Sequence, residues 1–461
     1  MSLEYKKENV YENLSNEEIN KMDEYVKEYM EFMSVVKTEY EGVKKVTSML
    51  KENGFKDITE FKKLKAGDKV YFINKDKSIY ASIIGSDDIE KGLTIIGAHI
   101  DSPRIDLKPM PMYENKDICM FKTQYYGGIK KYQWLTIPLS MHGVIYDKND
   151  VKHEILIGED ESEPCFTITD LLPHLGREQL SKKASEFIDP EKMSVIIGSL
   201  KDLEQDENKR TVKSNILKIL NKKYGIEEID FARSEISFTP AFKPRYIGFD
   251  KGLISAYGHD DRICSFATVK ALINSTKTKK TLVAMIVDKE EIGSVGNTSM
   301  SSNIFDMYIK KLIKLKGEKD VDLFEVYYNS KMLSADVSTA VDPCYEEVSD
   351  IQNGNIVGSG VSLEKYTGSG GKYNASDANA AYVSKVLKLF EENNVMFQMG
   401  TLGKIEKGGG GTIAYILAEK GVDVIDCGTP VLSMHAPFET VSITDTYMTY
   451  KACEVFFNKM N

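Results

Sequence analysis

The stretch TLVAMIVDKEEIGS, residues 281–294, decides the fold, because it joins a continuous apolar run to the adjacent glutamates Glu290 and Glu291. A short apolar run that ends in polar residues is typical of a strand buried within a sheet. Neighbouring residues that leave a strand point in different directions, so one carboxylate can bind a metal ion while the other carries a proton. We therefore expect a chemically active loop at the end of this strand.

Helix and strand signals alternate on both sides of this stretch. This alternation predicts an α/β fold, a mostly parallel or mixed sheet covered by helices, with active groups at the carboxyl ends of its strands. The predicted helices lie within residues 15–53, after 258, and within 376–393 and 444–460. The predicted strands lie within residues 69–85, 93–101, 281–288 and 326–337.

Residues 108–247 differ from the flanking sequence, because they carry short β-type segments separated by polar stretches. A chain of 461 residues also exceeds the usual size of a single hydrophobic core. We therefore predict an inserted β-rich domain at 108–247, within a larger domain formed by residues 1–107 and 248–461.

Charge and composition exclude several classes of protein. The net charge is −10 and no block rich in lysine and arginine is present, which disfavours a nucleic-acid partner. No apolar run approaches membrane-spanning length or resembles the core of a signal peptide, so we expect no membrane partner and a cytoplasmic location. The six cysteines are scattered without a CxxC pair, which indicates reduced thiols.

Acids and histidines follow several other apolar runs of the predicted sheet. Each alone has an ordinary structural interpretation, but the ends of parallel strands meet at one edge, where histidine and carboxylates without cysteine suit a pair of zinc or manganese ions. The motifs are IIGAHIDSP (His99, Asp101), AYGHDDRIC (His259, Asp260, Asp261), SADV (Asp336) and VLSMHAPFE (His435, Glu439).

These motifs, in this order, resemble the dinuclear metallo-aminopeptidases grouped with aspartyl aminopeptidase and vacuolar aminopeptidase I. The resemblance covers essentially the whole chain, including the insertion, and implies a zinc-exopeptidase-like fold. It implies that one metal is held by His99 and Asp336 and the second by Glu291 and His435. Asp260 would bridge the two ions.

The resemblance also implies a mechanism and its participants. Glu290 is expected to be the general base and Asp101 to orient the ring of His99. Two divalent ions per subunit, zinc or alternatively manganese or cobalt, would share and activate a water molecule. The substrates would be peptides with a free N-terminus. Asp261, Glu439 and His259 are expected to have supporting or structural roles.

Two glycine-rich stretches could suggest a phosphate-binding loop. KYTGSGGKYNAS, which contains Lys372, lacks the GxxxxGK[ST] spacing, and EKGGGGTIAYILAEKG lacks a GxGxxG after a clear strand. We instead expect these glycines to let the backbone approach a substrate near the metals, with Lys372 as a candidate substrate-binding residue.

His174 lies in DLLPHLGRE, within the insertion. This segment resembles the family stretch that reaches from one subunit into the active site of its neighbour, although an exposed loop histidine fits the sequence equally well. If the family role applies, His174 contacts substrate and the insertion forms dimers, which build a larger homo-oligomer, a dodecamer by resemblance.

The chain departs from aspartyl aminopeptidases at two positions. Those enzymes carry histidines three and six residues after the aspartate of SAD, where this chain has Thr339 and Asp342. An acidic substrate side chain would meet like charge at Asp342, so a neutral preference is at least as well supported. Two alternative functions stay open at this point, another dinuclear amidohydrolase (a deacylase or carboxypeptidase) and a non-catalytic assembly protein with a structural metal site.

Overall fold

The computed structural model describes residues 3–276, 278–370, 372 and 376–460, which form two compact units. The first unit contains the chain up to Asp101, residues 244–434 and the chain from Phe438 onward. The second contains residues 102–243 together with the short segment 435–437. The boundaries predicted from the sequence, after residues 107 and 247, lie a few residues further along the chain.

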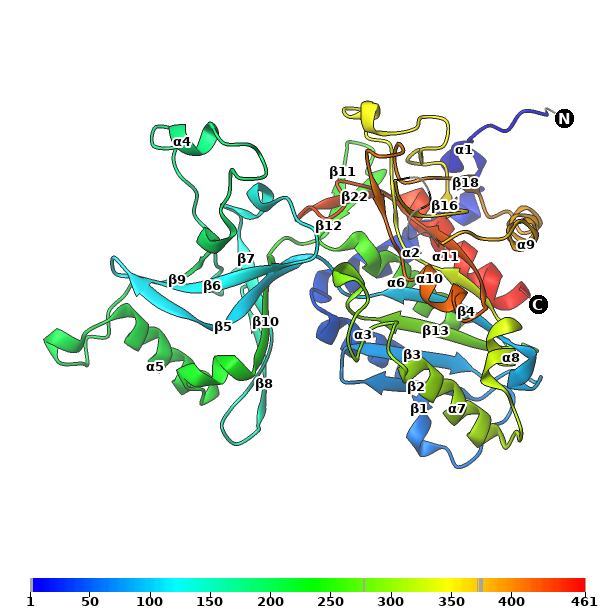
Figure 1. The fold of residues 1–461 in the computed structure, drawn as a ribbon, viewed down its shortest axis with the longest axis horizontal. Helices are drawn as coiled ribbons and strands as arrows, with labels where there is room; N and C mark the ends of the chain where they lie inside the picture. The colour runs from blue at the N-terminus through cyan, green and yellow to red at the C-terminus, as the bar shows by residue number, and fades with distance from the viewer. Residues whose placement is uncertain (1–2, 277, 371, 373–375, 461) are drawn as a thin grey trace. The chain divides into compact units, whose positions relative to one another are not determined.

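A mixed nine-stranded sheet organises the first unit (Figure 1). Four neighbouring strands at its centre, β13, β4, β14 and β20, are all parallel, so their carboxyl ends share one edge. The fold class predicted from the sequence is confirmed. In spatial order the strands are β1 (Lys56–Asp57), β2 (Lys69–Asn74), β3 (Ser78–Ile83), β13 (Thr281–Val287), β4 (Leu93–His99), β14 (Lys331–Ser334), β20 (Asp423–Gly428), β16 (Val361–Glu364) and β18 (Phe397–Met399).

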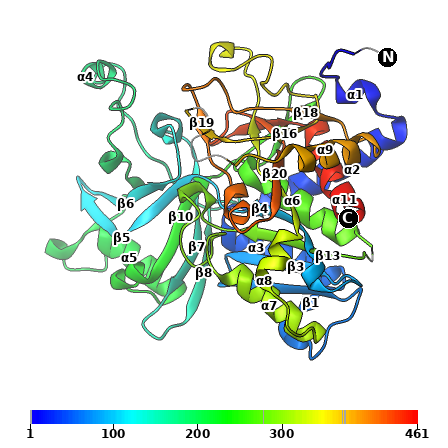
Figure 2. The ribbon, with the colours of Figure 1, turned by 45° about the vertical axis from the view of Figure 1, so that its right-hand side comes forward.

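Helices cover both faces of this sheet, as Figures 1 and 2 show. Alternate residues of each strand point to opposite faces, so Ile96 and Ala98 of β4 join one core while Leu93 and Ile95 join the other. The first core receives α1 (Val10–Asn13), α2 (Asn16–Val35), α3 (Glu39–Glu52), α6 (His259–Asn274), α9 (Ala380–Glu391) and α11 (Ile443–Lys459). The second receives α7 (Ile304–Lys316), α8 (Leu323–Tyr328) and α10 (Ala414–Ala418).

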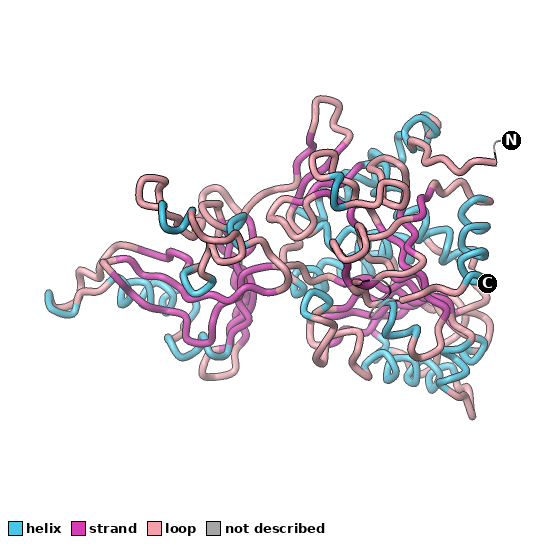
Figure 3. The backbone as a smooth tube through the Cα atoms, turned by 45° about the horizontal axis from the view of Figure 1, so that its top comes forward, coloured by secondary structure: helices cyan, strands magenta, loops and turns pink. Residues whose placement is uncertain are grey.

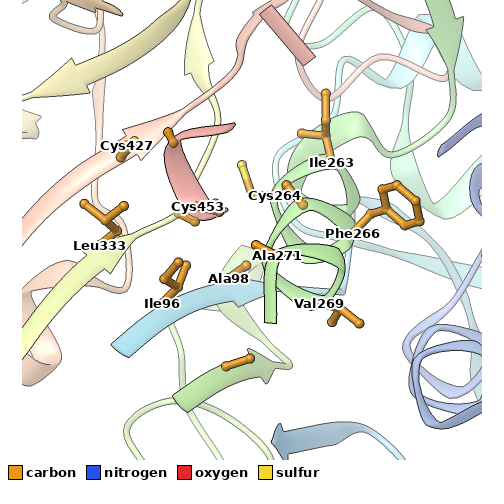
Figure 4. Packing of buried hydrophobic residues seen from close by; sticks show 14 of the residues in the cluster. Ile96, Ala98, Ile263, Cys264, Phe266, Val269, Ala271, Leu333, Cys427 and Cys453 are labelled. Atoms are coloured by element: carbon orange, nitrogen blue, oxygen red, sulfur yellow. The ribbon is translucent and has the colours of Figure 1, made fainter. Parts of the chain in front are cut away.

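The first core also contains three cysteines. Cys264, Cys427 and Cys453 are buried beside Ile96 and Leu333, where they pack as small apolar side chains (Figure 4). All six cysteines of the chain are free thiols, as the sequence indicated.

Smaller sheets complete the first unit. A five-stranded sheet follows the order β11 (Arg245–Ile247), β12 (Leu253–Ala256), β22 (Glu439–Ser442), β21 (Pro430–Leu432) and β15 (Ser338–Thr339). A two-stranded sheet contains β17 (Gly368–Ser369) and β19 (Gly409–Gly410).

The second unit is built on a six-stranded antiparallel sheet, with helices as separate segments between its strands (Figure 3). Its first strand pairs with its last, because Ile105 of β5 lies opposite Phe238 of β10. The chain therefore enters and leaves this sheet on neighbouring strands. The strand order is β8 (Lys152–Ile157), β7 (Leu139–Tyr146), β10 (Ser234–Pro240), β5 (Arg104–Asn115), β6 (Ile118–Tyr126) and β9 (Val195–Gly198), and the helices are α4 (Arg177–Leu180) and α5 (Val212–Tyr224).

One predicted strand is shorter than the sequence suggested. The sequence predicts a strand from residue 326, but helix α8 continues to Tyr328, and β14 begins only at Lys331. The side chain of Asp322 caps the start of this helix by accepting a hydrogen bond from Phe324 N, which favours a helix over an extended chain. Among the helices of the described residues, none combines the length and apolar character that crossing a bilayer requires.

Candidate metal centre

His99 is the last residue of β4, and its ring is fully buried. The ring nitrogen Nδ1 lies 3.0 Å from the carbonyl oxygen of Asp101 and 3.4 Å from Asp101 Oδ1. The hydroxyl of Ser265 donates to the backbone carbonyl of His99 over 2.6 Å and fixes the end of the strand. With its Nδ1–H directed at Asp101, the ring presents Nε2 as the free lone pair, as a metal-binding histidine requires.

Three carboxylates from different parts of the chain surround this Nε2 atom. Asp260 Oδ1 lies at 3.2 Å, Asp336 Oδ1 at 3.8 Å and Glu290 Oε2 at 3.9 Å. Within the described part of the chain, the buried Nε2 atom makes no hydrogen bond of acceptable geometry. A divalent cation between the nitrogen and these oxygens would satisfy all of them, so the residues present fit the metal that the sequence predicts.

Two groups of side chains each bring potential ligand atoms within 4.8 Å of one another. One group contains His99, Asp260 and Glu291, and the other contains His99, Asp261 and Asp336. The structure thus brings together the predicted ligands that come from four separate motifs of the first unit. It also places Asp261 closer to the centre than the sequence suggested.

The Asp260–Asp261 pair lies at the start of α6, where the backbone is not yet helical. The peptide bond between the two residues is cis, and Gly258 before them has a φ of 78°, which glycine adopts without strain. The backbone N–H of Asp260 donates to Glu439 Oε2 over 3.0 Å, and Asp261 Oδ2 accepts from His99 N over 3.2 Å. Both aspartates are therefore held by contacts outside their own helix.

Asp101 has a second role that sequence reasoning missed. Glu290 and Glu291 begin a short 3-10 turn, Glu290–Ile292, after Lys289 in a left-handed conformation. Asp101 Oδ1 accepts from Glu290 N and Asp101 Oδ2 accepts from Glu291 N, each over 3.2 Å. One carboxylate therefore orients the His99 ring and also holds the turn that carries both glutamates. No local sequence pattern predicts this contact, because Asp101 and Glu290 are 189 residues apart.

The electrostatics of the cluster reflect crowded, buried negative charge. Burial raises the pKa of Asp336 well above its usual value, and the nearby carboxylates of Asp261 and Glu290 raise it further. Burial likewise raises the pKa of Asp261, with a further contribution from Asp260. Burial alone would lower the pKa of His99, but the acidic side chains around the ring raise it well above normal. A bound dication would stabilise the ionised carboxylates.

His259 lies beside these ligands but has a structural environment. Its ring is fully buried, and Nδ1 lies 2.6 Å from the hydroxyl oxygen of Tyr29 on α2. Burial lowers its pKa to about 3, so the ring is neutral. The contact joins α2 to the start of α6 and is consistent with the structural role expected from the sequence.

Three predicted site residues lie elsewhere. His435 belongs to the second unit, where its Nδ1 is 2.8 Å from the carbonyl oxygen of Gly128. Lys372 is exposed, forms a 2.9 Å ion pair with Asp377 and borders a cavity of about 700 Å³ in the first unit. His174 is exposed in a turn of the second unit. The roles predicted for these three residues stay predictions.

The fold and the cluster define a metal-dependent hydrolase, built on a mixed sheet with a histidine–carboxylate centre at its edge. Residues 32–457 match the profile of the aminopeptidase I zinc metalloproteases (M18), and the chain belongs to this family. The resemblance read from the motifs is thereby confirmed, together with the expected enzyme class, a metallo-aminopeptidase, and zinc as the family's metal.

Relatives match over nearly the whole chain. The probable M18 family aminopeptidase 1 of Clostridium acetobutylicum is 43% identical over 460 residues, which cover 99% of this chain and 98% of that protein. The crystal structure of an M18 aminopeptidase from Thermotoga maritima has a TM-score of 0.95 and 44% identity, covering 99% of this chain and 100% of that one. The structure of the mApe1 dodecamer of S. cerevisiae shares the fold at 22% identity, with a TM-score of 0.76 over 95% of this chain and 97% of that one.

Proposed function

We propose that this enzyme removes N-terminal residues from peptides with two divalent ions per subunit and with Glu290 as the general base. The supporting observation is the arrangement around His99, where Glu290 Oε2 lies 3.9 Å from the same nitrogen that faces Asp260 and Asp336. The proposed ligands are His99 and Asp336 for one ion, Glu291 and His435 for the other, and Asp260 as the bridge.

The protein's own groups would divide the chemical work. When bound, the ions lower the pKa of a water molecule and polarise the scissile carbonyl group. The Glu290 side chain is 17% exposed, which lets it accept a proton from water and deliver it to the leaving amine. Asp101 keeps Glu290 in position through the backbone of the turn. Because Asp261 Oδ2 already accepts from His99 N, we assign Asp261 a positioning role and leave Asp336 as the ligand.

The experiment that tests this function compares two substrates. A chromogenic aminoacyl amide with a free α-amine should be hydrolysed by the zinc-loaded enzyme, and the same amide acetylated at its amine should not. Release of acetate from the acetylated compound, with its chromogenic amide bond left intact, would support a deacylase, and no turnover of either compound would support an assembly protein. Adding zinc, manganese or cobalt after chelation would identify the ion that supports turnover.

The side-chain preference rests on Asp342, which replaces a histidine of the aspartyl enzymes. Its carboxylate accepts from Cys344 N over 2.8 Å and lies at the start of a loop that follows Asp336 in the chain. We propose that leucyl and alanyl amides are cleaved at least as well as aspartyl amides. Replacing Asp342 with histidine should shift kcat/KM toward aspartyl amides, and clear aspartyl selectivity of the unmodified enzyme would contradict the proposal.

We also propose a cytoplasmic location, in keeping with the six free thiols.

We further propose a homo-oligomer in which His174 completes the site of a neighbouring subunit. Mixing inactive His174→Ala and Glu290→Gln subunits tests this proposal. Random pairing gives about half mixed dimers, each with one intact site, so roughly a quarter of sites should regain activity. Mixed assemblies, verified by mass, that stay inactive would remove His174 from the site.

A further inference from the structure

Two histidines are candidate zinc ligands, and each has its Nδ1 atom beside a backbone carbonyl oxygen. For His99 the oxygen is that of Asp101, at 3.0 Å, and for His435 it is that of Gly128, at 2.8 Å. A carbonyl oxygen can only accept a hydrogen bond, so Nδ1 carries the proton in both rings and the lone pair is on Nε2. Metal-binding histidines are generally oriented by a hydrogen bond of this kind from the nitrogen that does not bind the ion.

The two carbonyl groups differ in how far they lie from their histidine along the chain. Asp101 is two residues from His99, whereas Gly128 is 307 residues from His435. A local acceptor comes with the end of the strand, but a distant one is in place only when the chain around it is folded. Gly128 and the segment 435–437 both belong to the second unit. The orientation of the His435 ring therefore depends on the fold of that unit.

The backbone around His435 is strained. His435 has a φ of 66°, and Ser433 has a φ of 57°, in the connection between β21, which ends at Leu432, and β22, which begins at Glu439. Left-handed conformations are costly for residues other than glycine and persist only where the surrounding structure enforces them, which happens most often at functional sites. The hydrogen bond to Gly128 is a contact of this enforcing kind, since it holds the side chain of one of the two strained residues.

Gly128 also leaves the room that the imidazole ring occupies. A Cβ atom on Gly128 would lie 3.3 Å from His435 Nδ1 and 3.7 Å from Cε1, and the first distance is shorter than ordinary van der Waals contact. Gly127 has a different requirement, because its φ is 73°, a conformation that glycine adopts without strain. The first glycine of the pair thus sets the path of the backbone, and the second allows the ring to approach it.

We propose that Gly128 is a positioning residue for zinc, because its carbonyl oxygen fixes the tautomer and the orientation of the His435 ring. The inference rests on the proposed function, in which His435 and Glu291 hold one of the two ions. His99 and the carbonyl group of Asp101 both belong to the first unit. The ion on His99 is then oriented from within the first unit, whereas the ion on His435 depends on a loop of the second.

The contact links zinc binding to the order of this loop. An ion on Nε2 favours the tautomer and the ring orientation in which Nδ1 donates to Gly128, so zinc and the loop stabilise each other by reciprocity. Gly128 itself is exposed, as is Lys130 in the same loop. Exposed loops open more readily than the strands of a core, so a contact with a bound ion should have a measurable effect on this one.

Zinc titration of the full-length protein against a competing chelator tests the proposal. The unmodified protein should bind two ions, and Gly128→Ala should weaken one of them about 10- to 100-fold, the typical cost of losing a contact that supports a ligand. The other ion should keep its affinity. Excess zinc should restore the kcat of this variant on a leucyl amide, which it could not do for a misfolded site.

Lys130→Ala is the matched control, because it changes an exposed side chain of the same loop and leaves the carbonyl group of Gly128 in place. This variant should bind both ions like the unmodified protein. A loss of zinc equal to that of Gly128→Ala would assign the effect to the loop in general and overturn the specific role of Gly128.

Glu291→Gln identifies the ion that Gly128 affects. Because Glu291 and His435 are assigned to the same ion, the double variant should retain one ion with the affinity measured in Glu291→Gln alone. Weaker binding of that remaining ion in the double variant would overturn the proposal, as would unchanged affinity of both ions in Gly128→Ala. A single ion in the unmodified protein, or two in Glu291→Gln, would instead contradict the proposed function and this inference with it.

Hydrogen exchange of the unmodified protein covers the case in which Gly128→Ala does not fold. Amides of the peptide that contains Gly128 should exchange more slowly with two zinc ions bound than with one. Glu291→Gln, titrated over the same range of zinc concentration, should not show this protection. Equal exchange rates with one and two ions would contradict the link between the loop and the ion.

Discussion

Two buried acidic clusters lie on one sheet, and they differ in the chemistry of their side chains and in their access to solvent. The zinc centre has a histidine nitrogen among its carboxylates, and its Glu290 side chain is 17% exposed. The row of Ser334, Asp426 and Glu364 has only oxygen donors, and none of its residues is more than 5% exposed. The same sheet therefore carries one group of acids that is open to solvent and suited to catalysis, and another that is sealed in the interior.

The largest expected difference between the clusters is in the rate of hydrolysis. Glu290→Gln should lower kcat at least ~100-fold, because an amide cannot act as a general base. Asp426→Asn, which changes an acid of the sealed row, should leave kcat of the zinc-saturated enzyme near normal. Steady-state kinetics on a leucyl amide measure both. A similar loss of rate in the two variants would contradict a catalytic role that is limited to the zinc centre.

The second-largest expected difference between the clusters is in the amount of zinc that their variants retain. Glu291→Gln should lose zinc from one position, because it removes a charged ligand, whereas Glu290→Gln should keep both ions. Glu364→Gln, the matching change in the row, should retain zinc when the metal is in excess. Elemental analysis after gel filtration gives the stoichiometry. Zinc loss from Glu290→Gln with full retention by Glu291→Gln would reverse the assignment of base and ligand.

Asp101→Asn should have an intermediate effect on the zinc centre. The amide retains one acceptor oxygen, so it cannot accept from both Glu290 N and Glu291 N as the carboxylate does. Loss of such supporting contacts typically costs about 10- to 100-fold in metal affinity or activity. Zinc affinity, measured by competition with a zinc-binding indicator, and kcat should fall together. If kcat fell while zinc affinity stayed constant, Asp101 would act on the base alone.

The smallest effect concerns the pH dependence of the free energy of unfolding. The pKa values of Glu364 and Asp426, about 7 and about 6, lie above the ordinary values of 4.5 and 3.8, so the folded state binds more protons than the unfolded state. Their contribution to stability is therefore present below about pH 4 and is lost as the pH rises through 6 to 7.

Urea unfolding at a series of pH values, compared between unmodified protein and Asp426→Asn, isolates this contribution. The groups that orient the two acids, Ser338, Thr412 and Asn355, do not titrate. The variant should show a shallower decline in its unfolding midpoint between pH 4 and 7. Identical pH profiles for the two proteins would place the titrating groups elsewhere.

The sequence indicated candidate residues for the zinc centre but none for the row, because the two are encoded differently. His99, Asp336 and the glutamate pair each follow an apolar run directly, so a strand end can be read for each, and the order of the motifs carries the family resemblance. Asp426 and Glu364 lie within strands and gain meaning only from the register between β20 and β16. Hydrophobic periodicity finds strands but does not specify which residues face each other across them.

The pairing of β5 with β10 has a consequence for how the metal centre assembles. His99 and Asp261, which share a hydrogen bond, are 162 residues apart, and the second unit occupies most of that interval. Once Ile105 and Phe238 are neighbours, the effective loop between the two residues falls to roughly 30 residues, which reduces the closure entropy by about 1.5 kcal/mol. If the second unit folds first, it therefore brings together the zinc ligands that precede it and those that follow it in the sequence.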